Sequence, residues 1–437
     1  MTEAFSAKFI RVIDANRSVK DELAAAIQLQ STRRRISVTD LINPRKAFFS
    51  RTHPEVPPSA DRAQAMLAGT GFHNEFERAV STEEFAEQLV EYEGIVGKID
   101  IYEDLPVELK TTRSLRPGLE SIYPQYVDQL GAYAVMTGRM SGHLLLYGRG
   151  EFGRPPELRA FQVEFTDLPG IGTEMLHRRD LLRHALETGD PTGLPRCIWL
   201  GRCEYQELCG CESAPEIGPL VGASSVSIHP DEQLETLFAG RLQMGKEQLS
   251  GFRFYHLAFP RKAAFGLLDD GDDAAPTTQD RLGQLNRRGF FRALDDVLYR
   301  GMPGAFTSVP VRVGKLADRV RLCRGVPTIL KSSKARDFIE RKRLPAERPW
   351  NVDTLAFQCA LLGAEIGRLV LYYEAIPENK FMVYDVMFSD LPAVRAELER
   401  RLHLLESGAP PAELPPCPAW MAKNCPYRDR CGCGDAA

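Results

Sequence analysis

The chain has 437 residues, which is enough for two domains that each bury a hydrophobic core. Its composition, 43% hydrophobic and 26% charged residues, is that of a globular protein, and it contains no run of about 18 apolar residues that would predict a membrane span. The formal net charge of −4 lacks the strongly basic character that usually marks a nucleic-acid-binding domain.

The first 30 residues mix acidic and basic side chains and lack the apolar block of a signal peptide, which predicts a cytoplasmic protein. Basic residues then gather in two short runs, which taken alone predict a solvated surface. They are Arg33, Arg34, Arg35, Arg45, Lys46 and Arg51.

The predicted elements of the first half begin with a helix over residues 59–81, where apolar residues recur four apart. Two extended segments follow at 94–103 and 107–112, then a helix at 126–138 and a strand at 142–150. This order predicts an α/β core with acidic residues on its strands.

Ten cysteines in a chain without an export signal predict metal ligands or free thiols rather than disulfides. Cys323 and Cys359 stand alone and are predicted to be buried apolar residues. Four thiolates close in sequence suit a [4Fe-4S] cluster or a structural Zn²⁺, although the paired C-x2-C knuckles common in zinc sites are absent from the sequence. The two groups are Cys197, Cys203, Cys209 and Cys211, and Cys417, Cys425, Cys431 and Cys433.

The second half of the chain repeats the first. "INPRKAFF" matches "AFPRKAAF", "PVELKTTRS" matches "PTILKSSKA" and "GRCEYQELCGC" matches "KNCPYRDRCGC", in one order and with offsets of 216 to 225 residues. We therefore predict a tandem duplication, with domains at 1–211 and 226–437 and a linker at 212–225.

In the first copy, Asp100 is followed eight residues later by Glu108 and then by Lys110. Paired carboxylates bind Mg²⁺ or Mn²⁺, and the metal stabilises the charge that develops during phosphodiester cleavage and acidifies a water. A lysine beside them can orient or deprotonate that water. By itself, the pattern also describes three surface charges on edge strands.

The wider motif order is G-x-x-x-H ending at His73, then Asp100, then Glu-x-Lys, then Q-x-x-x-Y from Gln129 to Tyr133. It resembles the iron–sulfur nucleases of the RecB-like branch of the PD-(D/E)XK superfamily, over residues 36–211. The resemblance implies two tandem restriction-endonuclease-like domains, each a central mixed sheet flanked by helices and ending in a four-cysteine segment. It also implies one [4Fe-4S] cluster in each domain, with Zn²⁺ as the alternative.

The resemblance further implies individual roles. His73, Asp100, Glu108 and the backbone carbonyl of Leu109 would bind the metal, Lys110 would handle the attacking water, and Gln129 and Tyr133 would contact DNA and support the site. Glu77 lies four residues after His73 and receives no role.

One feature departs from the family, in which a cysteine normally precedes the "PRK" motif. Asn43 and Phe259 occupy that place here. Each copy instead has an additional cysteine after its signature, Cys211 or Cys433, so the ligand is replaced locally and the cluster ties down only the C-terminal segment.

The second copy has lost the acids. Without carboxylates it cannot hold a hard cation, so it is predicted to be catalytically inactive, while Lys331 survives. The aligned replacements are Arg287 for His73, Ala317 for Asp100, Ile329 for Glu108, Thr354 for Gln129 and Gln358 for Tyr133.

The sequence thus predicts a metal-dependent deoxyribonuclease, an exonuclease on single-stranded DNA ends that acts in repair, recombination, phage defence or CRISPR adaptation. No phosphate-binding G-x-x-x-x-G-K-[ST] loop is present, so any unwinding would need a separate helicase as partner. The resemblance implies DNA and CRISPR adaptation proteins as further partners, and no membrane is involved. The alternatives are a non-catalytic iron–sulfur scaffold that binds nucleic acid, and a zinc-stabilised scaffold.

Overall fold

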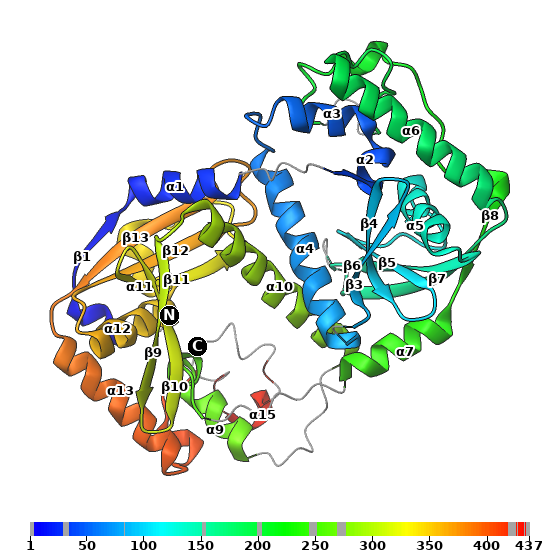
Figure 1. Ribbon diagram of the computed structural model, residues 1–437. Helices are drawn as coiled ribbons and strands as arrows, with labels where there is room; N and C mark the ends of the chain where they lie inside the picture. Colours follow the sequence, from blue (N-terminus) through cyan, green and yellow to red (C-terminus); the bar gives the residue numbers. More distant parts are fainter. Residues whose placement is uncertain are drawn as a thin grey trace. The chain divides into compact units, whose positions relative to one another are not determined.

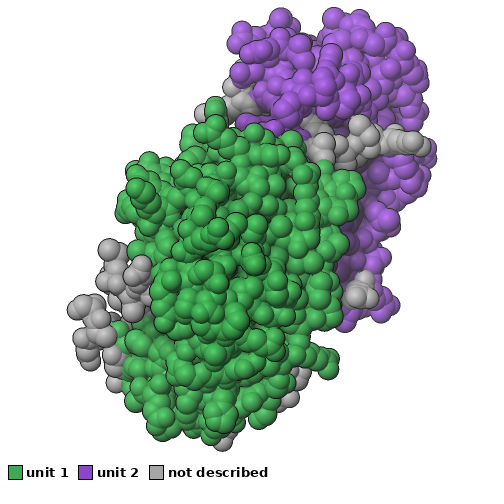
Figure 2. All heavy atoms as spheres, turned by 90° about the vertical axis from the view of Figure 1, so that its left-hand side faces the viewer, with its two compact units in different colours: residues 1–27, 247–275, 295–437 green, residues 28–246, 276–294 purple. Residues whose placement is uncertain are grey.

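The computed structural model groups the chain into two compact units, which Figure 2 colours separately. Unit 1 contains residues 1–27, 247–275 and 295–437, and unit 2 contains residues 28–246 and 276–294. The described residues are 4–28, 35–82, 84–150, 154–198, 203–243, 251–268, 277–417, 425, 427–431 and 433. None of the helices within these ranges has both the length and the apolar character needed to cross a membrane.

A seven-stranded sheet forms the centre of unit 2, with helices on both faces (Figure 1). Its elements are β2 (Ile36–Ser37), α2 (Val38–Ile42), α3 (Pro44–Thr52), α4 (Ala60–Val80), β3 (Ala86–Tyr92), β4 (Ile95–Tyr102), β5 (Pro106–Thr112), α5 (Pro124–Thr137), β6 (Ser141–Gly148), β7 (Glu157–Phe165), α6 (Leu168–Thr188), η2 (Cys211–Ser213), η3 (Ala223–Ser225), β8 (Val226–Pro230), α7 (Glu232–Gln243) and the first part of α10 (Thr278–Gly301). The helices and strands predicted between residues 59 and 150 are therefore confirmed.

The strands of this sheet follow the order β2-β4-β5-β6-β7-β8, with β3 also paired to β4. β5 and β6 run parallel in the interior of the sheet, whereas β4–β5 and β6–β7 are antiparallel. Interior parallel strands are covered on both faces and therefore carry continuous apolar runs. The fully buried run from Leu144 to Tyr147 on β6 fits this position.

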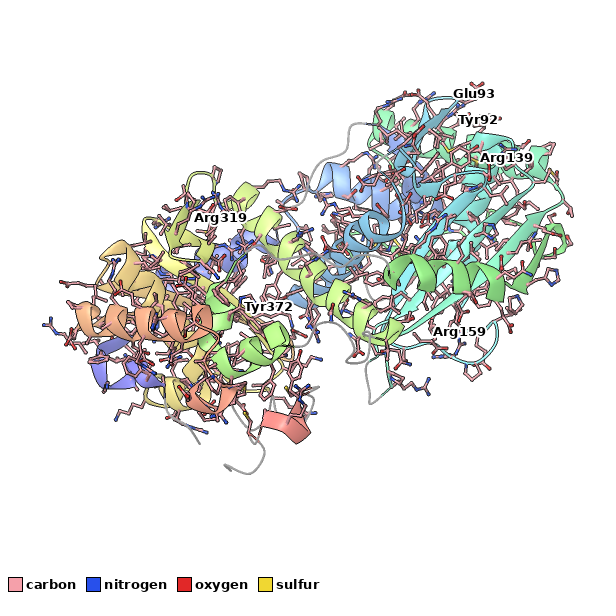
Figure 3. The ribbon with its side chains drawn as sticks, turned by 90° about the horizontal axis from the view of Figure 1, so that it is seen from below. Tyr92, Glu93, Arg139, Arg159, Arg319 and Tyr372 are labelled. Carbon is pink, nitrogen blue, oxygen red and sulfur yellow. The ribbon has the colours of Figure 1, made fainter. Side chains whose placement is uncertain are left out.

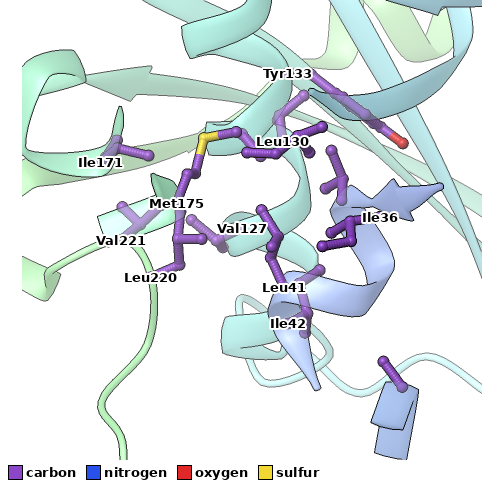
Figure 4. Packing of buried hydrophobic residues seen from close by; sticks show 14 of the residues in the cluster. Ile36, Leu41, Ile42, Val127, Leu130, Tyr133, Ile171, Met175, Leu220 and Val221 are labelled. Carbon is purple, nitrogen blue, oxygen red and sulfur yellow. The ribbon is translucent and has the colours of Figure 1, made fainter. Parts of the chain in front are cut away.

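A separate hydrophobic core lies on each face of the sheet. Leu144 belongs to the core beneath α5 and α6, whereas Leu145 belongs to the core beneath α4 and α7. Figure 4 shows the first core, where Leu130 of α5 and Met175 of α6 lie close to the residues of α2. Because the sheet is packed on both faces, the strands that carry Asp100 and Glu108 are held in place.

Unit 1 is built around a six-stranded sheet of order β1-β13-β12-β11-β10-β9. Its elements are η1 (Phe5–Phe9), β1 (Ile10–Ala15), α1 (Arg17–Ile27), α8 (Phe254–Ala258), α9 (Pro260–Leu268), the rest of α10, β9 (Phe306–Val313), β10 (Leu316–Cys323), β11 (Val326–Ser333), η4 (Arg341–Arg343), α11 (Leu344–Glu347), α12 (Pro349–Leu362), β12 (Ile366–Tyr373), β13 (Phe381–Phe388), α13 (Leu391–Glu406), η5 (Pro411–Glu413) and α15 (Arg428–Cys431).

The two units repeat one arrangement. β9 to β13 have the same order and relative directions as β3 to β7, including one parallel pair, β11–β12. Buried arginines also make matching contacts: Arg178 donates to the carbonyl of Leu41 at 3.3 Å, and Arg401 donates to the carbonyl of Leu257 at 3.1 Å. These correspondences support the duplication predicted from the sequence.

The unit boundaries differ from those predicted, because the first strand of each copy lies in the other unit. β1 pairs with β13 in unit 1, and β8 pairs with β7 in unit 2. Each incoming strand satisfies the backbone groups of a sheet edge. Residues 4–27 therefore fold with the second copy, and residues 226–243 fold with the first.

The segment before each of these strands is held by an aspartate. Asp353 accepts a hydrogen bond from the amide of Ser6 at 2.9 Å, and Asp128 accepts one from the amide of Val221 at 2.9 Å. Val221 is buried within the predicted linker 212–225, so that segment packs onto unit 2 rather than spanning freely.

Candidate metal centres

Four elements of unit 2 carry the predicted catalytic residues. β4 and β5 form a hairpin in which Tyr102 pairs with Pro106, and this pairing sets Asp100 opposite the strand that bears Glu108. The amide of Leu109 donates to Asp100 Oδ2 at 2.7 Å. The backbone of one strand thus fixes the carboxylate of the other.

Helix α4 brings further ligand atoms to Asp100. His73 Nδ1 lies 3.6 Å from Asp100 Oδ1. One ligand atom from each of His73, Glu77 and Asp100 lies within 4.8 Å of the others, a spacing at which the three could hold a metal ion. Carboxylate oxygens suit a hard divalent cation. Glu77 joins this group because residues four apart share one face of a helix.

Glu108 adds a buried carboxylate to the same region. It is 1% exposed, and its Oε1 pairs with Lys110 Nζ. Its Oε2 has no hydrogen-bond partner among the described residues, although a buried carboxylate oxygen normally has one. Burial and the nearby charge of Asp100 raise the pKa of Glu108 to about 8. A bound divalent cation would relieve both the missing contact and the repulsion, so these residues fit such an ion.

The neighbouring acids differ in ionisation. Burial acts to raise the pKa of Asp100, but His73, Lys110 and the amide of Leu109 outweigh it and lower that pKa. Burial and the charge of Asp100 raise the pKa of Glu77 to about 9. Of these acids, Asp100 is therefore the one whose surroundings favour the ionised form.

Lys110 is held in place by a chain of hydrogen bonds. Its Nζ donates to Gln129 Oε1 at 2.7 Å, and Gln129 Nε2 donates to the hydroxyl of Tyr133 at 3.0 Å. That hydroxyl donates to the carbonyl of Lys98 at 2.8 Å. Tyr133 is only 3% exposed, and its hydroxyl is the link between Gln129 and the backbone of β4.

The four cysteines of unit 2 are all buried and form no disulfide. Cys197, Cys209 and Cys211 place their sulfurs within 4.8 Å of one another and could hold a metal ion. A hydrogen bond with Cys197 lowers the pKa of Cys203 to about 6, which links the fourth cysteine to this group. Burial and contact with Cys211 raise the pKa of Cys209 to about 11.

The cysteines of unit 1 are buried in a similar way. The amide of Cys417 lies 3.3 Å from Cys433 Sγ, and the amide of Cys433 lies 3.4 Å from Cys431 Sγ. Burial, followed by repulsion from Cys433, raises the pKa of Cys417 to about 12. Cys323 and Cys359 are completely buried, as predicted.

An arginine, buried in unit 2 and half-buried in unit 1, links each "PRK" helix to its cysteine segment. Arg45 is 4% exposed and donates to the carbonyl of Cys209 at 2.6 Å, and Arg261 donates to the carbonyl of Cys431 at 3.1 Å. Each cysteine segment is thus joined to an early helix of its copy by hydrogen bonds.

The expectation of a solvated basic surface holds for Arg35, which is exposed, but not for the second run of basic residues. Arg45 is buried, Lys46 pairs with Glu204 at 3.0 Å, and Arg51 pairs with Asp40 at 2.7 Å. Arg33 and Arg34 lie outside the described residues. A run of basic residues in the sequence does not show which side chains form ion pairs within the fold and which face solvent.

The second copy lacks the acids, but two aligned positions need correction. Leu322 pairs with Pro327, which lies two residues before Ile329, just as Tyr102 pairs with the residue two before Glu108. Val320, rather than Ala317, therefore takes the place of Asp100. Arg287, which was predicted to replace His73, belongs to the part of α10 in unit 2.

No family model and no curated protein matches the chain. One similar solved structure is described as "Crystal structure of SSO0001"; it is 13% identical and has a TM-score of 0.30, with 46% of this chain and 98% of that chain covered.

Glu77 was missed as a site residue, although its i+4 spacing from His73 was visible.

In metal-free protein, replacing Glu77 by glutamine is expected to raise the thermal midpoint by at least about 2 °C at pH 9 and by less at pH 5. Because the pKa of Glu77 is raised in the folded protein, folding favours its protonated form. This contribution to the stability of the folded state is complete below the ordinary carboxyl pKa and is lost as the pH rises toward about 9. Thermal unfolding in chelator at pH 5, 7 and 9 tests this, and an advantage that is equal at all three values would contradict it.

Proposed function

We propose that unit 2 is a metal-dependent deoxyribonuclease of the PD-(D/E)XK type that acts on single-stranded DNA ends. One observation carries the proposal: Glu108 is buried beside Asp100, its Oε1 pairs with Lys110, and its Oε2 has no hydrogen-bond partner among the described residues. Two carboxylates of different ionisation beside one positioned lysine is the arrangement that metal-assisted phosphodiester hydrolysis requires.

The residues that would hold Mg²⁺ or Mn²⁺ are Asp100, Glu108 and His73, with Glu77 as a further carboxylate. The cation would supply charge stabilisation for the phosphate and a more acidic water. Lys110 would accept or donate the proton of that water, and Gln129 would hold the ammonium group toward Glu108. The carbonyl of Leu109 remains a predicted ligand.

We propose that each four-cysteine group holds a [4Fe-4S] cluster, with Zn²⁺ as the alternative. Four buried cysteines without disulfides support a metal group in each unit. The thiolates would supply the ligands, and Arg45 and Arg261 would link the groups to the "PRK" helices. DNA, together with a helicase or CRISPR adaptation proteins, would be the partners.

The function is tested with end-labelled single-stranded and duplex DNA, incubated with Mg²⁺ or Mn²⁺ and cluster-replete protein. Loss of label from single strands is expected, with none in chelator and none from Asp100→Ala. Absence of cleavage on both substrates by the wild-type protein would favour the alternative of a non-catalytic nucleic-acid-binding scaffold.

A further inference from the structure

Unit 1 contains a cavity of about 310 Å³ at the place where the second copy has lost its acids. Residues of β10, β11, α8 and α12 line it. Its volume falls at the lower end of the range of about 300–1,000 Å³ that small-molecule sites occupy. All of its lining residues lie in unit 1.

The lining is rich in positive charge. Arg319, Arg321 and Lys331 contribute cations, and Asp318 is the one acid among the lining residues. Arg321 forms an ion pair with Asp295, and Asp318 accepts from the amide of Phe254 at 3.0 Å. Figure 3 labels Arg319 on β10.

Lys331 is the cation left without a partner. Its side chain makes no hydrogen bond or ion pair within the described part of the chain, yet it retains exposed surface within the cavity lining. The surrounding protein atoms, followed by Arg321, lower its pKa. A bound anion would offset both effects, because its negative charge favours the ammonium form.

Aromatic and polar groups complete the lining. Trp350 and Tyr255 both border the cavity, and Tyr255 is 49% exposed. Gln358 is 7% exposed, and its Oε1 is buried without a hydrogen-bond partner among the described residues. An aromatic surface suits the face of a nucleobase, and an unpartnered carbonyl oxygen requires a donor such as an amino or hydroxyl group.

The lining of the cavity can be compared with the acidic site of unit 2. β5 and β11 occupy matching sheet positions, with Glu108 and Lys110 on β5 matched by Ile329 and Lys331 on β11. Loss of the acid removes the hard-cation ligand but keeps the lysine. The remaining lysine, Lys331, can bind a phosphate group without a metal ion.

We propose that this cavity binds a nucleoside monophosphate unit, with its phosphate against Lys331 and its base against Trp350 and Tyr255. The unit can be a free nucleotide or the phosphorylated end of a strand. The proposal does not depend on the nuclease activity, because the cavity lies in the unit that lacks the carboxylates.

The test uses full-length, cluster-replete protein carrying Asp100→Ala, in chelator, so that no strand is cleaved. Isothermal titration calorimetry with dAMP and with inorganic phosphate gives the affinity of the free ligands. Fluorescence polarisation with a single-stranded oligonucleotide, with and without a 5′-phosphate, reports on strand ends. We expect dAMP to bind at least tenfold more tightly than phosphate. Tighter binding of the 5′-phosphorylated strand than of its unphosphorylated form would identify the strand end as the source, and equal binding would identify the free nucleotide.

The decisive variant is Lys331→Met, which removes the charge and keeps the length of the side chain. It is expected to weaken dAMP binding by about tenfold or more, because a hydrogen bond to a charged group contributes about 1.5–3 kcal/mol. Lys334→Met, an exposed lysine of the same segment, is the matched control and should bind normally.

Three results would overturn the proposal: no dAMP binding by the Asp100→Ala protein, equal affinity for dAMP and phosphate, or equal losses in Lys331→Met and Lys334→Met. Thermal unfolding of both variants accompanies the titrations. Lys331 is exposed and makes no hydrogen bond or ion pair with the described residues, so its replacement should leave the midpoint nearly unchanged, and weaker binding would not reflect unfolding.

Discussion

Replacing Lys110 by methionine is expected to slow DNA cleavage by at least about 100-fold while metal binding persists. The reason is that Lys110 has no ligand atom for a cation when charged, but it is the one ammonium group that is hydrogen-bonded to Gln129 and paired with Glu108. Removing it takes away the proton-handling group and leaves the carboxylates in place.

Lys98→Met provides the matched control for this variant. Lys98 lies on β4, two residues from Asp100, but its ammonium group is exposed and pairs with Glu87. Single-turnover cleavage rates give the loss of activity, and Mn²⁺ titration followed by electron paramagnetic resonance gives the metal affinity. Similar rate losses in both variants, or lost Mn²⁺ binding in Lys110→Met alone, would show that Lys110 does not have the proposed role.

If the cysteines of unit 2 hold the proposed metal group, replacing Cys209 by serine is expected to remove it and to lower the thermal midpoint by about 8–16 °C. Loss of a structural metal belongs to the changes that cost more than about 4 kcal/mol, and each kcal/mol corresponds to about 2–4 °C in a domain of this size. Cys209 is central because its sulfur lies 3.0 Å from that of Cys211 and its carbonyl accepts from Arg45.

Absorbance near 400 nm and the iron content of anaerobically purified protein are the measurements for this variant. With one cluster in each unit, Cys209→Ser should keep about half of the iron and of the absorbance. Cys359→Ser, at a buried cysteine outside both groups, should keep all of both. A wild-type protein that contains zinc and no iron would overturn the cluster assignment, and full iron retention in Cys209→Ser would exclude Cys209 as a ligand.

Local sequence patterns predicted the elements that carry the candidate site. The extended segments around Asp100 and Glu108 became β4 and β5, and the apolar period of four became α4 with His73 on it. These features follow from side-chain periodicity and chain propensity, which act over a few residues. The burial of Cys323 and Cys359 was predicted because neither has a neighbouring cysteine in the sequence, and both are completely buried.

The contacts that complete the site were not visible in the sequence. Glu77 stood at the correct helical spacing, but its membership of the group depends on how α4 lies against β4. The burial of Arg45 depends on the carbonyl of Cys209, which lies 164 residues away along the chain. Single-sequence patterns carry no information on such distant pairs.

The sequence by itself determined the duplicated motif order, the retention of acids in one copy and their loss in the other. Only the tertiary structure decided which sheet each of these strands completes, with β1 on β13 and β8 on β7, since the backbone groups that pair strands are the same in every residue except proline. It also decided that Lys331 lines a cavity and has no side-chain partner among the described residues, because an ionisable side chain acquires its environment from elements that meet only when the chain folds.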